Sequence, residues 1–217
     1  MNRIVFAPRS RVPISPSHRA DSKARTRQKV LEAARDLFME RGYDAATIRD
    51  IAARAGLSTG AVFASFSDKA DLFNTVLAQD TERQSDLVKT PASEIPTEAA
   101  LMELFRRAYG FHMEQLPLLQ AATGLSWSQG LGGPLGNRPV YSLALAAMSA
   151  ILTRAIERGE LPASMDEALL SEMLWDAYLS NYRQALFDGW GLEQLVNRLE
   201  RQVHVLLAGA GASAPPT

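Results

Sequence analysis

Apolar residues in the segment 47–72 recur with the spacing of short helices. Ile48, Ile51, Ala52 and Ala55 stand at i, i+3, i+4 and i+7, which is one face of a helix. Thr47 precedes this face and can cap its N-terminus with the hydroxyl oxygen. Gly56 follows the face, and glycine adopts the left-handed backbone that ends a helix sharply. We therefore expect a short helix that ends in a tight turn.

A second short helix is predicted directly after this turn. Leu57 gives the turn an apolar contact, Ser58 is a second N-cap candidate, and Val62 and Phe66 face inward at i and i+4. The residues left facing outward, or partly so, are Thr59, Ala61, Phe63 and Ser65. Asp68 can cap a third helix whose apolar face comprises Leu72, Phe73, Val76 and Leu77. This order predicts a helix-turn-helix, which places one helix in the major groove of DNA. By spacing alone, an ordinary corner in a helical protein is an equally good interpretation.

The remainder of the chain also has a helical pattern. Helices are expected over residues 98–115, 117–129, 140–158, 165–187 and 192–207, with a glycine-rich loop at 130–139. A proline-containing break at 90–97 is the expected domain junction. The predicted fold is all-α: an N-terminal three-helix domain with the helix-turn-helix, joined to a larger helical domain. The predicted divisions are a flexible basic arm (1–22), the DNA-binding domain (23–89), the regulatory domain (90–208) and a disordered tail (209–217).

Composition narrows the class of protein. The 217 residues are 47% hydrophobic and 22% charged, typical of a soluble globular protein. No apolar run approaches the roughly 20 residues that span a bilayer, and the first residues lack the apolar core of a secretory signal. The absence of cysteine excludes disulfides and thiolate metal sites. We expect a cytoplasmic protein without membrane contact, metal or cofactor.

Charge is divided unevenly between the two halves of the chain. Residues 1–90 contain 15 basic and 11 acidic residues, a net charge of +4, whereas residues 91–217 contain 8 and 13, a net charge of −5. Residues 1–30 hold eight basic residues and a single acid, Asp21. Three prolines are expected to keep this arm out of a regular helix. Arg25 and Arg27 are candidates for phosphate contacts, although a solvated tail explains the arm equally well.

Longer stretches resemble one family of DNA-binding proteins. VLEAARDLFMERGY at 30–43 is similar to ILEAALELFAERGY, and Thr47 and the IA…AG pattern (Ile51, Ala52, Ala55, Gly56) follow it as in that family. LSTGAVFASFSDKADL at 57–72 is similar to VSxGxLYxHFxSKxxL. These motifs cover about a fifth of the chain and resemble the N-terminal domain of the TetR family of bacterial transcriptional repressors.

The resemblance implies roles for individual residues. Thr47 and Lys69 match family positions that bind phosphates, and Arg49 is a candidate for a phosphate or base contact. Ser58, Thr59 and Ala61 open the recognition helix, whose first turn meets base edges. The family has tyrosine and histidine where this chain has Phe63 and Ser65. Phe63 retains apolar contact with DNA and Ser65 has a shorter polar arm, so the family does not imply the operator sequence.

The resemblance also implies a homodimer, formed by the last two helices, that reads a palindromic site in double-stranded DNA. In this chain a wide apolar stripe runs along the last helix through Leu192, Leu195, Val196, Leu199, Val203 and Leu206. The stripe is wider than packing on one neighbour requires, which allows a dimer surface, but it could equally be core within one subunit.

Large adaptable side chains in the middle helices are candidates to line a cavity for a small apolar or aromatic effector. The candidate ligand-binding residues are Phe105, Tyr109, His112, Met113, Trp127, Tyr141, Met148, Trp175, Tyr178 and Tyr182. Most of them could equally be ordinary core. Trp127, Trp175 and Tyr178 are preferred, because buried tryptophan and tyrosine need polar partners. We expect a ligand-responsive regulator, most simply a repressor that its effector releases from DNA.

Alternatives to a DNA-binding regulator fit less of the sequence. GLSTG at 56–60 fits the serine-hydrolase motif G-x-S-x-G, but a helical face stands where that motif needs a strand. GLGGPLG at 130–136 misses G-x-G-x-x-G by one residue, and the three histidines are far apart. We therefore expect no enzyme. A helical protein-interaction module without DNA binding leaves the basic first half and the turn residues unexplained.

Overall fold

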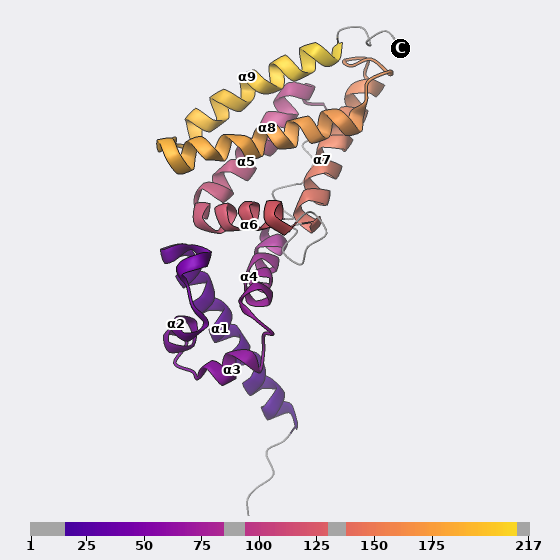
Figure 1. Cartoon of the computed structure of the whole chain (residues 1–217). Coiled ribbons are helices and arrows are strands. Elements are labelled where there is room, and N and C mark those ends of the chain that lie inside the picture. Colours follow the sequence, from indigo (N-terminus) through magenta and orange to yellow (C-terminus); the bar gives the residue numbers. More distant parts are fainter. Residues whose placement is uncertain (1–15, 85–93, 130–137, 212–217) are drawn as a thin grey trace, which may run out of the picture.

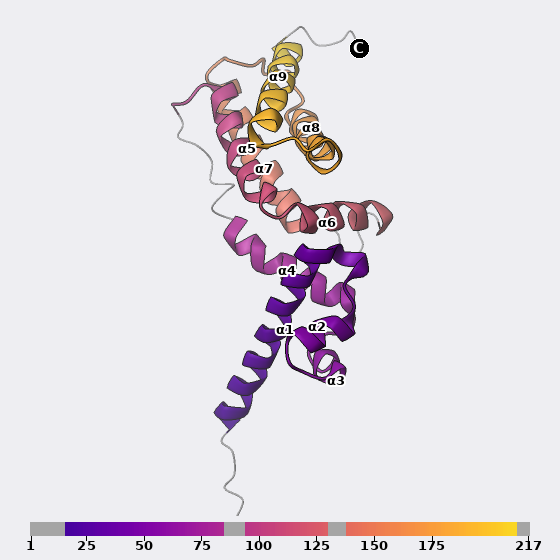
Figure 2. The ribbon, with the colours of Figure 1, turned by 90° about the vertical axis from the view of Figure 1, so that its left-hand side faces the viewer.

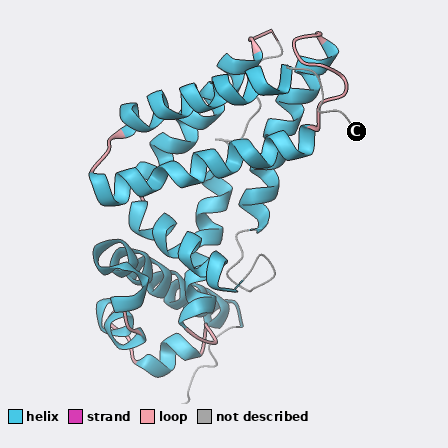
Figure 3. Ribbon diagram, turned by 45° about the horizontal axis from the view of Figure 1, so that its top comes forward, coloured by secondary structure: helices cyan, strands magenta, loops and turns pink. Residues whose placement is uncertain are grey.

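The computed structural model describes residues 16–84, 94–129 and 138–211 of the chain. Four helices form an N-terminal unit, which we call the head (Figure 1). They are α1 (Pro16–Ala45), α2 (Ile48–Arg54), α3 (Thr59–Phe63) and α4 (Lys69–Gln84). The described part of the chain contains helices, turns and loops but no strand, as the sequence predicts (Figure 3).

The other helices form a second unit, the body, above the head in Figure 1. They are α5 (Thr97–Met113), α6 (Leu116–Gln129), α7 (Arg138–Glu157), α8 (Glu167–Asp188) and α9 (Leu192–Gly211). Helices α8 and α9 pack against one another, α9 packs against α5, and α8 packs against α7. Among the described helices, none is long and apolar enough to cross a membrane.

Both predicted ends of the chain are more helical than expected. Helix α1 begins at Pro16, so Arg25 and Arg27 lie on a helix and not in an arm before it. Proline is tolerated in the first turn of a helix, where its missing N–H group would have no partner. Helix α9 continues to Gly211, so the first residues of the predicted tail are helical too. Residues 1–15 and the predicted boundary at 89–90 lie outside the described residues.

The head has its own hydrophobic core. Its fully buried side chains include Phe38 of α1, Val62 of α3 and Phe73 of α4, each 0% exposed. Phe38 and Phe73 meet edge to face, with ring centroids 5.2 Å apart. Two residues of α6, Leu118 and Ala122, are buried in this same core. Helix α6 therefore belongs to the head by its packing, although it follows α5 in the chain (Figure 2).

The body core lies between α5, α7, α8 and α9. The apolar stripe of α9 faces inward, and Leu195, Val196, Leu199 and Val203 are buried in this core. For these four residues the interpretation as a dimer surface is wrong, because the subunit's own α5 and α8 cover them, whereas Leu192 and Leu206 are only partly buried. The outward face of α9 is formed by other residues, including Arg201 and Val205, which are both exposed.

Candidate nucleic-acid interface and aromatic core

Helix α2 begins with the cap that its sequence predicts. The hydroxyl oxygen of Thr47 accepts a hydrogen bond from the backbone N–H of Asp50 at 3.2 Å, and the Asp50 carboxylate accepts one from the N–H of Thr47 at 3.4 Å. This reciprocal arrangement is a capping box, which satisfies two backbone donors at the helix start. The hydrogen bond from the Thr47 hydroxyl also lowers the pKa of the Asp50 carboxyl. Gly56 ends the turn with φ +68°, so its left-handed backbone is required there.

Helix α3 has one buried side and one exposed side. The hydroxyl oxygen of Ser58 caps it by accepting from the N–H of Ala61 at 3.2 Å. Val62 is buried, and Phe66 just beyond the helix is 2% exposed, so these two residues fix α3 to the head core. Thr59 is exposed, and 55% of the Phe63 surface is open to solvent. A large exposed aromatic side chain on a short helix is available for contact with another molecule.

Arg27 holds the end of this short helix in place. Its Nη1 donates to the backbone carbonyl of Ser65 at 2.7 Å, and its guanidinium lies 4.2 Å from the centre of the Phe66 ring. The phosphate contact predicted for Arg27 stays a prediction, and the structure shows that Arg27 positions the end of α3. Sequence reasoning missed this role, since the two residues stand 38 positions apart.

A second arginine attaches α2 to α1 in the same way. Both terminal nitrogens of Arg54 donate to the Glu40 carboxylate, at 2.8 and 2.7 Å. A bidentate pair of this kind fixes orientation as well as distance. Both α2 and the end of α3 are thus fixed to α1. No sequence motif singles out either pair.

The ammonium group of Lys69 points toward the end of α1. Its Nζ donates to the carbonyl oxygens of Tyr43, Asp44 and Ala46 at 2.9, 3.3 and 3.3 Å, and it lies 4.2 Å from the centre of the Tyr43 ring. These contacts hold the start of α4 against α1. The ammonium group already donates to three carbonyl oxygens. The phosphate contact predicted for Lys69 stays a prediction.

The other predicted DNA contacts are spread over the outer side of the head. Arg25 on α1 and Arg49 on α2 are exposed, whereas Ala61 and Ser65 are half-buried. The fold therefore places α3, the start of α2 and the basic turns of α1 on one small helical unit (Figure 1). Among the described residues, no group of three or more histidine, aspartate or glutamate side chains could hold a metal ion.

Most predicted ligand-binding residues meet in the centre of the body. Phe105, Tyr109, Met148, Tyr178 and Tyr182 are each at most 3% exposed. The rings of Phe105 and Tyr178 stack with centroids 5.4 Å apart, and those of Tyr109 and Tyr178 are 4.7 Å apart. These side chains pack on one another, and other residues line the cavities described below. Met113 lies at the edge of this core, and the side chain of Trp127 lies outside the described part.

The outer wall of this core is partly open. Tyr141 and Trp175 are half-buried, and their rings meet edge to face with centroids 5.6 Å apart. Trp175 in turn lies 5.6 Å from Tyr178, measured between ring centroids. A continuous aromatic path therefore leads from the surface between α7 and α8 into the core.

A hydrogen-bond network runs through the same core. His112 Nδ1 lies 2.6 Å from the hydroxyl of Tyr178, which lies 2.7 Å from that of Tyr182. Burial lowers the pKa of His112 to about 4, against an opposing hydrogen bond to the Ala108 carbonyl, so the ring is neutral near pH 7. Burial raises the pKa of both tyrosines. The polar tips of this aromatic core are therefore uncharged.

Asn181 connects this core to α9. Its amide nitrogen donates to the Tyr109 hydroxyl at 3.2 Å and to Gln202 Oε1 at 2.7 Å, and its oxygen accepts from Arg198 at 2.8 Å. Asn181 is 1% exposed, and these three bonds satisfy its buried amide. The network fixes the positions of Arg198 and Gln202 on the outer side of α9.

Known proteins similar to this chain share both the head and the overall fold. A family model described as bacterial regulatory proteins, tetR family, matches residues 30–76. The HTH-type transcriptional repressor AcnR of Corynebacterium glutamicum is 36% identical over 86 residues, which cover 40% of this chain and 42% of AcnR. The chain thus matches less than half of the length of that relative.

Two further relatives match beyond the head. The HTH-type transcriptional regulator SrpR of Pseudomonas putida is 28% identical over 172 residues, which cover 74% of this chain and 78% of SrpR. The crystal structure of a TetR-family transcriptional regulator from Mesorhizobium loti superposes with a TM-score of 0.67 at 26% identity, and covers 88% of this chain and 98% of that chain. The head therefore matches the TetR family in sequence, and the fold is similar to that of a TetR-family regulator.

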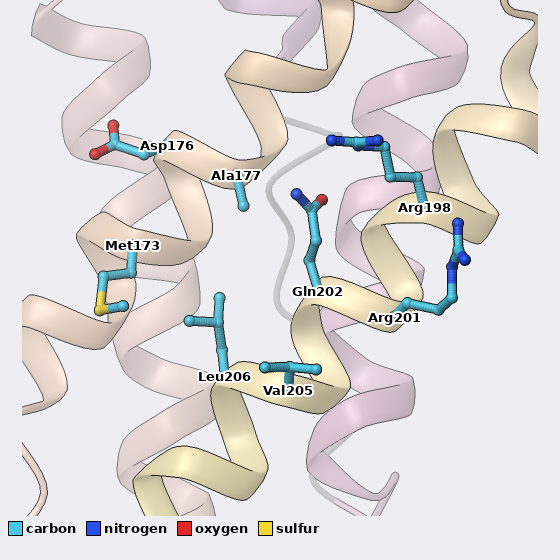
Figure 4. Close-up of a pocket in the computed structure, with 8 residues that line it drawn as sticks. All are labelled: Met173, Asp176, Ala177, Arg198, Arg201, Gln202, Val205 and Leu206. Atoms are coloured by element: carbon cyan, nitrogen blue, oxygen red, sulfur yellow. The ribbon is translucent and has the colours of Figure 1, made fainter.

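The body carries a groove on the outward side of α8 and α9. The groove has a volume of about 670 Å³, and it is lined by Met173, Asp176, Ala177, Arg198, Arg201, Gln202, Val205 and Leu206 (Figure 4). Met173 is 44% exposed and Val205 is 67% exposed, although both are large apolar residues. Phe187, near the end of α8, is 73% exposed. None of these residues belongs to the stripe predicted for the dimer except Leu206.

A second cavity lies between the head and α6. It measures about 560 Å³ and lies between the end of α1 (Arg41 to Ala45) and one side of α6 (Pro117 to Leu125). Beside this cavity, Arg35 of α1 donates to the side-chain oxygen of Gln115 at 2.7 Å. Gln115 precedes α6 and is 8% exposed, so this bond ties α1 to the connection between α5 and α6.

Proposed function

We propose that this chain is a homodimeric transcriptional repressor that binds a palindromic operator and releases it when a small apolar or aromatic effector binds the body. The structure of α3 in the head is the observation that supports this proposal most directly. A capped five-residue helix, α3, is fixed by Val62 and Phe66 and presents Phe63 to solvent. The exposed Phe63 and Thr59 thus lie on the side of α3 that faces away from the head core.

On DNA, α3 is the element that enters the major groove. Thr59 and Phe63 are its exposed side chains, and Phe63 suits contact with a thymine methyl group. In this proposal Thr47 at the start of α2, together with Arg25 and Arg49, meets phosphates on either side of the groove. Arg27 serves the same purpose indirectly, since it orients the end of α3.

The dimer of this proposal forms through the outward face of α8 and α9. Exposed apolar side chains lie near the start of α8 at Leu169 and Met173 and near its end at Phe187, and Val205 adds to them from α9. The opposite sides of both helices pack on α5 and α7. A large exposed apolar face on otherwise packed helices marks a surface for association. Two heads joined through this face would contact two half-sites of a palindrome.

The effector of this proposal enters the aromatic core from the side of Tyr141 and Trp175. The core supplies apolar walls with a few neutral polar tips, which suits an uncharged aromatic or apolar molecule. Because Tyr109, Tyr178 and Met148 are already packed together, the effector must displace side chains as it binds. It releases DNA only in so far as it binds the DNA-free geometry more tightly than the DNA-bound one.

DNA binding is tested by footprinting of the full-length protein on the DNA beside its own gene. We expect protection of two half-sites about 10 base pairs, or a multiple of that, apart, and an affinity that falls steeply between 50 and 200 mM salt. Phe63→Ala should weaken operator binding at least tenfold. Leu143→Ala, a matched change of an exposed apolar residue on α7, should leave it unaltered. An absence of DNA binding at 50 mM salt would favour a helical interaction module instead.

The effector step needs its own measurement. Footprinting is repeated with saturating uncharged aromatic compounds, and quenching of tryptophan fluorescence reports which of them bind. Release of the operator by a compound that binds supports the repressor. If every compound that binds leaves operator affinity unchanged, the effector part of the proposal fails while the DNA-binding part stands.

A further inference from the structure

The groove between α8 and α9 has opposite charges on its two sides. Asp176 extends from α8 on one side, and Arg201 and Arg198 extend from α9 on the other (Figure 4). Met173, Ala177, Val205 and Leu206 form the apolar floor and edge between them. The Arg198 guanidinium is held by Asn181, whereas within the described residues Asp176 and Arg201 have no ion-pair or hydrogen-bond partner.

The two unpaired charges lie at similar heights along the helix pair. Asp176 stands 13 residues before Gly189, and Arg201 stands 10 residues after Gly191. A helix rises about 1.5 Å per residue, so Asp176 is about 20 Å and Arg201 about 15 Å from the turn that joins the helices. The charges therefore lie across the groove from one another, with the apolar residues between them.

We propose that Asp176 and Arg201 set the register of the homodimer by pairing across its two-fold axis, Asp176 of each subunit with Arg201 of the other. This inference rests on the proposed dimer and names the residues that determine how its two subunits align. The occupant of the groove is thus a second copy of this chain, with its α8 laid over the first subunit's α9.

The groove is complementary to itself, which favours a second copy of this chain as its occupant. In a two-fold interface the same surface is used twice, so residue i meets residue j and j meets i. A rotation of 180° about an axis through the apolar centre carries the acidic side of one groove onto the basic side of the other. The same rotation places apolar residues on apolar residues. A shifted register would bring Asp176 toward its own copy, and like charges at an interface are unfavourable.

The inference is tested by the dissociation constant of the dimer, measured by sedimentation equilibrium at 50 mM salt. Asp176→Arg places three arginines together on each side of the interface, and Arg201→Asp places two aspartates together. Each single change should raise the dissociation constant at least tenfold. The double variant Asp176→Arg/Arg201→Asp exchanges the two charges and should restore the dissociation constant to within about threefold of the wild type. At 500 mM salt the single effects should shrink, because salt screens partly exposed charges.

Two further variants separate this inference from the dimer itself. Glu200→Arg alters the charge by the same amount as Asp176→Arg, at an exposed site on α9 that does not line the groove, and should leave the dimer unaltered. Met173→Arg puts a charge in the apolar centre and should dissociate it. If Met173→Arg yields monomers but the single charge reversals do not weaken association, or the double variant does not recover it, the register pairing is overturned and the dimer face stands. If Met173→Arg leaves the dimer intact, the proposed face is wrong. Circular dichroism checks that every variant is folded.

Discussion

Two glycines four positions apart, in the turn between α2 and α3 and in α3 itself, differ in whether the backbone requires glycine. Gly56 has φ +68°, a conformation that residues with a Cβ atom adopt at a cost. Gly60 lies within α3 and has no such requirement. A Cβ atom at Gly56 would meet nothing within 4 Å, so the strain of a substitution there comes from the backbone alone.

This difference makes the two positions a matched pair. Gly56→Ala should destabilise the protein by about 1–2 kcal/mol, whereas Gly60→Ala should stabilise it by about 0.5–1 kcal/mol through reduced freedom of the unfolded chain. At Gly60 the new Cβ would meet only the Ser58 hydroxyl, at an ordinary 3.8 Å. Scanning calorimetry should therefore give melting temperatures that shift in opposite directions. Equal losses at both sites would mean that the turn does not require the left-handed backbone.

His112 couples the stability of the body to pH. Its pKa is about 4 in the fold because of burial, compared with about 6.5 in an unfolded chain. Between these values the unfolded state binds a proton that the folded state does not, so stability is full above about pH 6.5 and falls as pH drops toward 4. We expect His112 to contribute a loss of about 2 kcal/mol between pH 7 and pH 5.

The measurement is urea unfolding at both pH values for the wild type and for His112→Gln. Other groups titrate in both proteins, so the difference between the two pH dependences isolates His112. The wild type should lose about 2 kcal/mol more than the variant on acidification. Equal losses in the two proteins would show that the imidazole is protonated as readily in the fold as in the unfolded chain.

At the scale of elements, α3 depends on a residue of α1. With five residues, α3 is too short to be stable as an isolated helix. Its position comes from the Ser58 cap, from buried Val62 and Phe66, and from the bond of Arg27 to the Ser65 carbonyl. The position of α3 is therefore determined by its contacts with the remainder of the head and not by its own helix-forming tendency.

Arg27 and Arg25 should consequently affect DNA binding in different ways. Arg27→Met keeps an apolar stem over Phe66 but loses the bond to α3, so operator affinity should fall about tenfold and the melting temperature should also drop. Arg25→Met removes an exposed charge, so the slope of log affinity against log salt should become shallower by about one, with little change in melting temperature. Binding titrations at four salt concentrations distinguish the two. An unaltered melting temperature for Arg27→Met would mean that the Ser65 bond does not position α3.

At the scale of the whole molecule, the physical boundary between head and body does not follow the order of the chain. Leu118 and Ala122 of α6 are buried in the head core, and Arg35 of α1 bonds to Gln115 beside the start of α6. The described residues thus place the head and α6 in one packed unit. The connection from α5 to α6 therefore links this packed unit to the body core.

Replacing Leu118 should loosen the head and not the body. Leu118→Ala removes a side chain that is 2% exposed, which should cost about 2–4 kcal/mol. Hydrogen exchange followed by mass spectrometry should show faster exchange in α1 and α4 than in α8 and α9. The matched control is Leu104→Ala, also 2% exposed but in the body core, which should give the reverse pattern. If Leu118→Ala loosened only the body helices, α6 would belong to the body after all.

Local signals in the sequence predicted the caps and the turn of the helix-turn-helix well. Thr47, Ser58 and Asp68 cap helices as expected, because a cap is formed by residues only three positions apart. Gly56 has the predicted left-handed backbone for the same local reason. The predicted DNA contacts stay predictions, although Thr59 and Phe63 are exposed as that role requires. The start of α1 was missed because three prolines outweighed helix-forming residues after Pro16.

The apolar stripe of α9 shows where local signals end. Periodicity identified the side of the helix that is buried, but both a subunit core and a partner subunit bury apolar residues in the same way. The fold decided for the core, and it left Val205 exposed on the other side of α9 and Met173 and Phe187 exposed on α8. Likewise, the pattern made the aromatic residues candidates to line a cavity or to form core, and which of the two they do depends on how closely α5, α7 and α8 approach.

The sequence by itself determined the helical fold, the helix-turn-helix and the TetR-family resemblance, because these depend on spacings of a few residues along one chain. Only the tertiary structure decided that Arg27 positions α3, that Lys69 meets carbonyl oxygens, that α6 packs with the head, and which side of α8 and α9 remains open. Each of these depends on residues that are far apart in sequence and are brought together by packing, and no local pattern records such a distance.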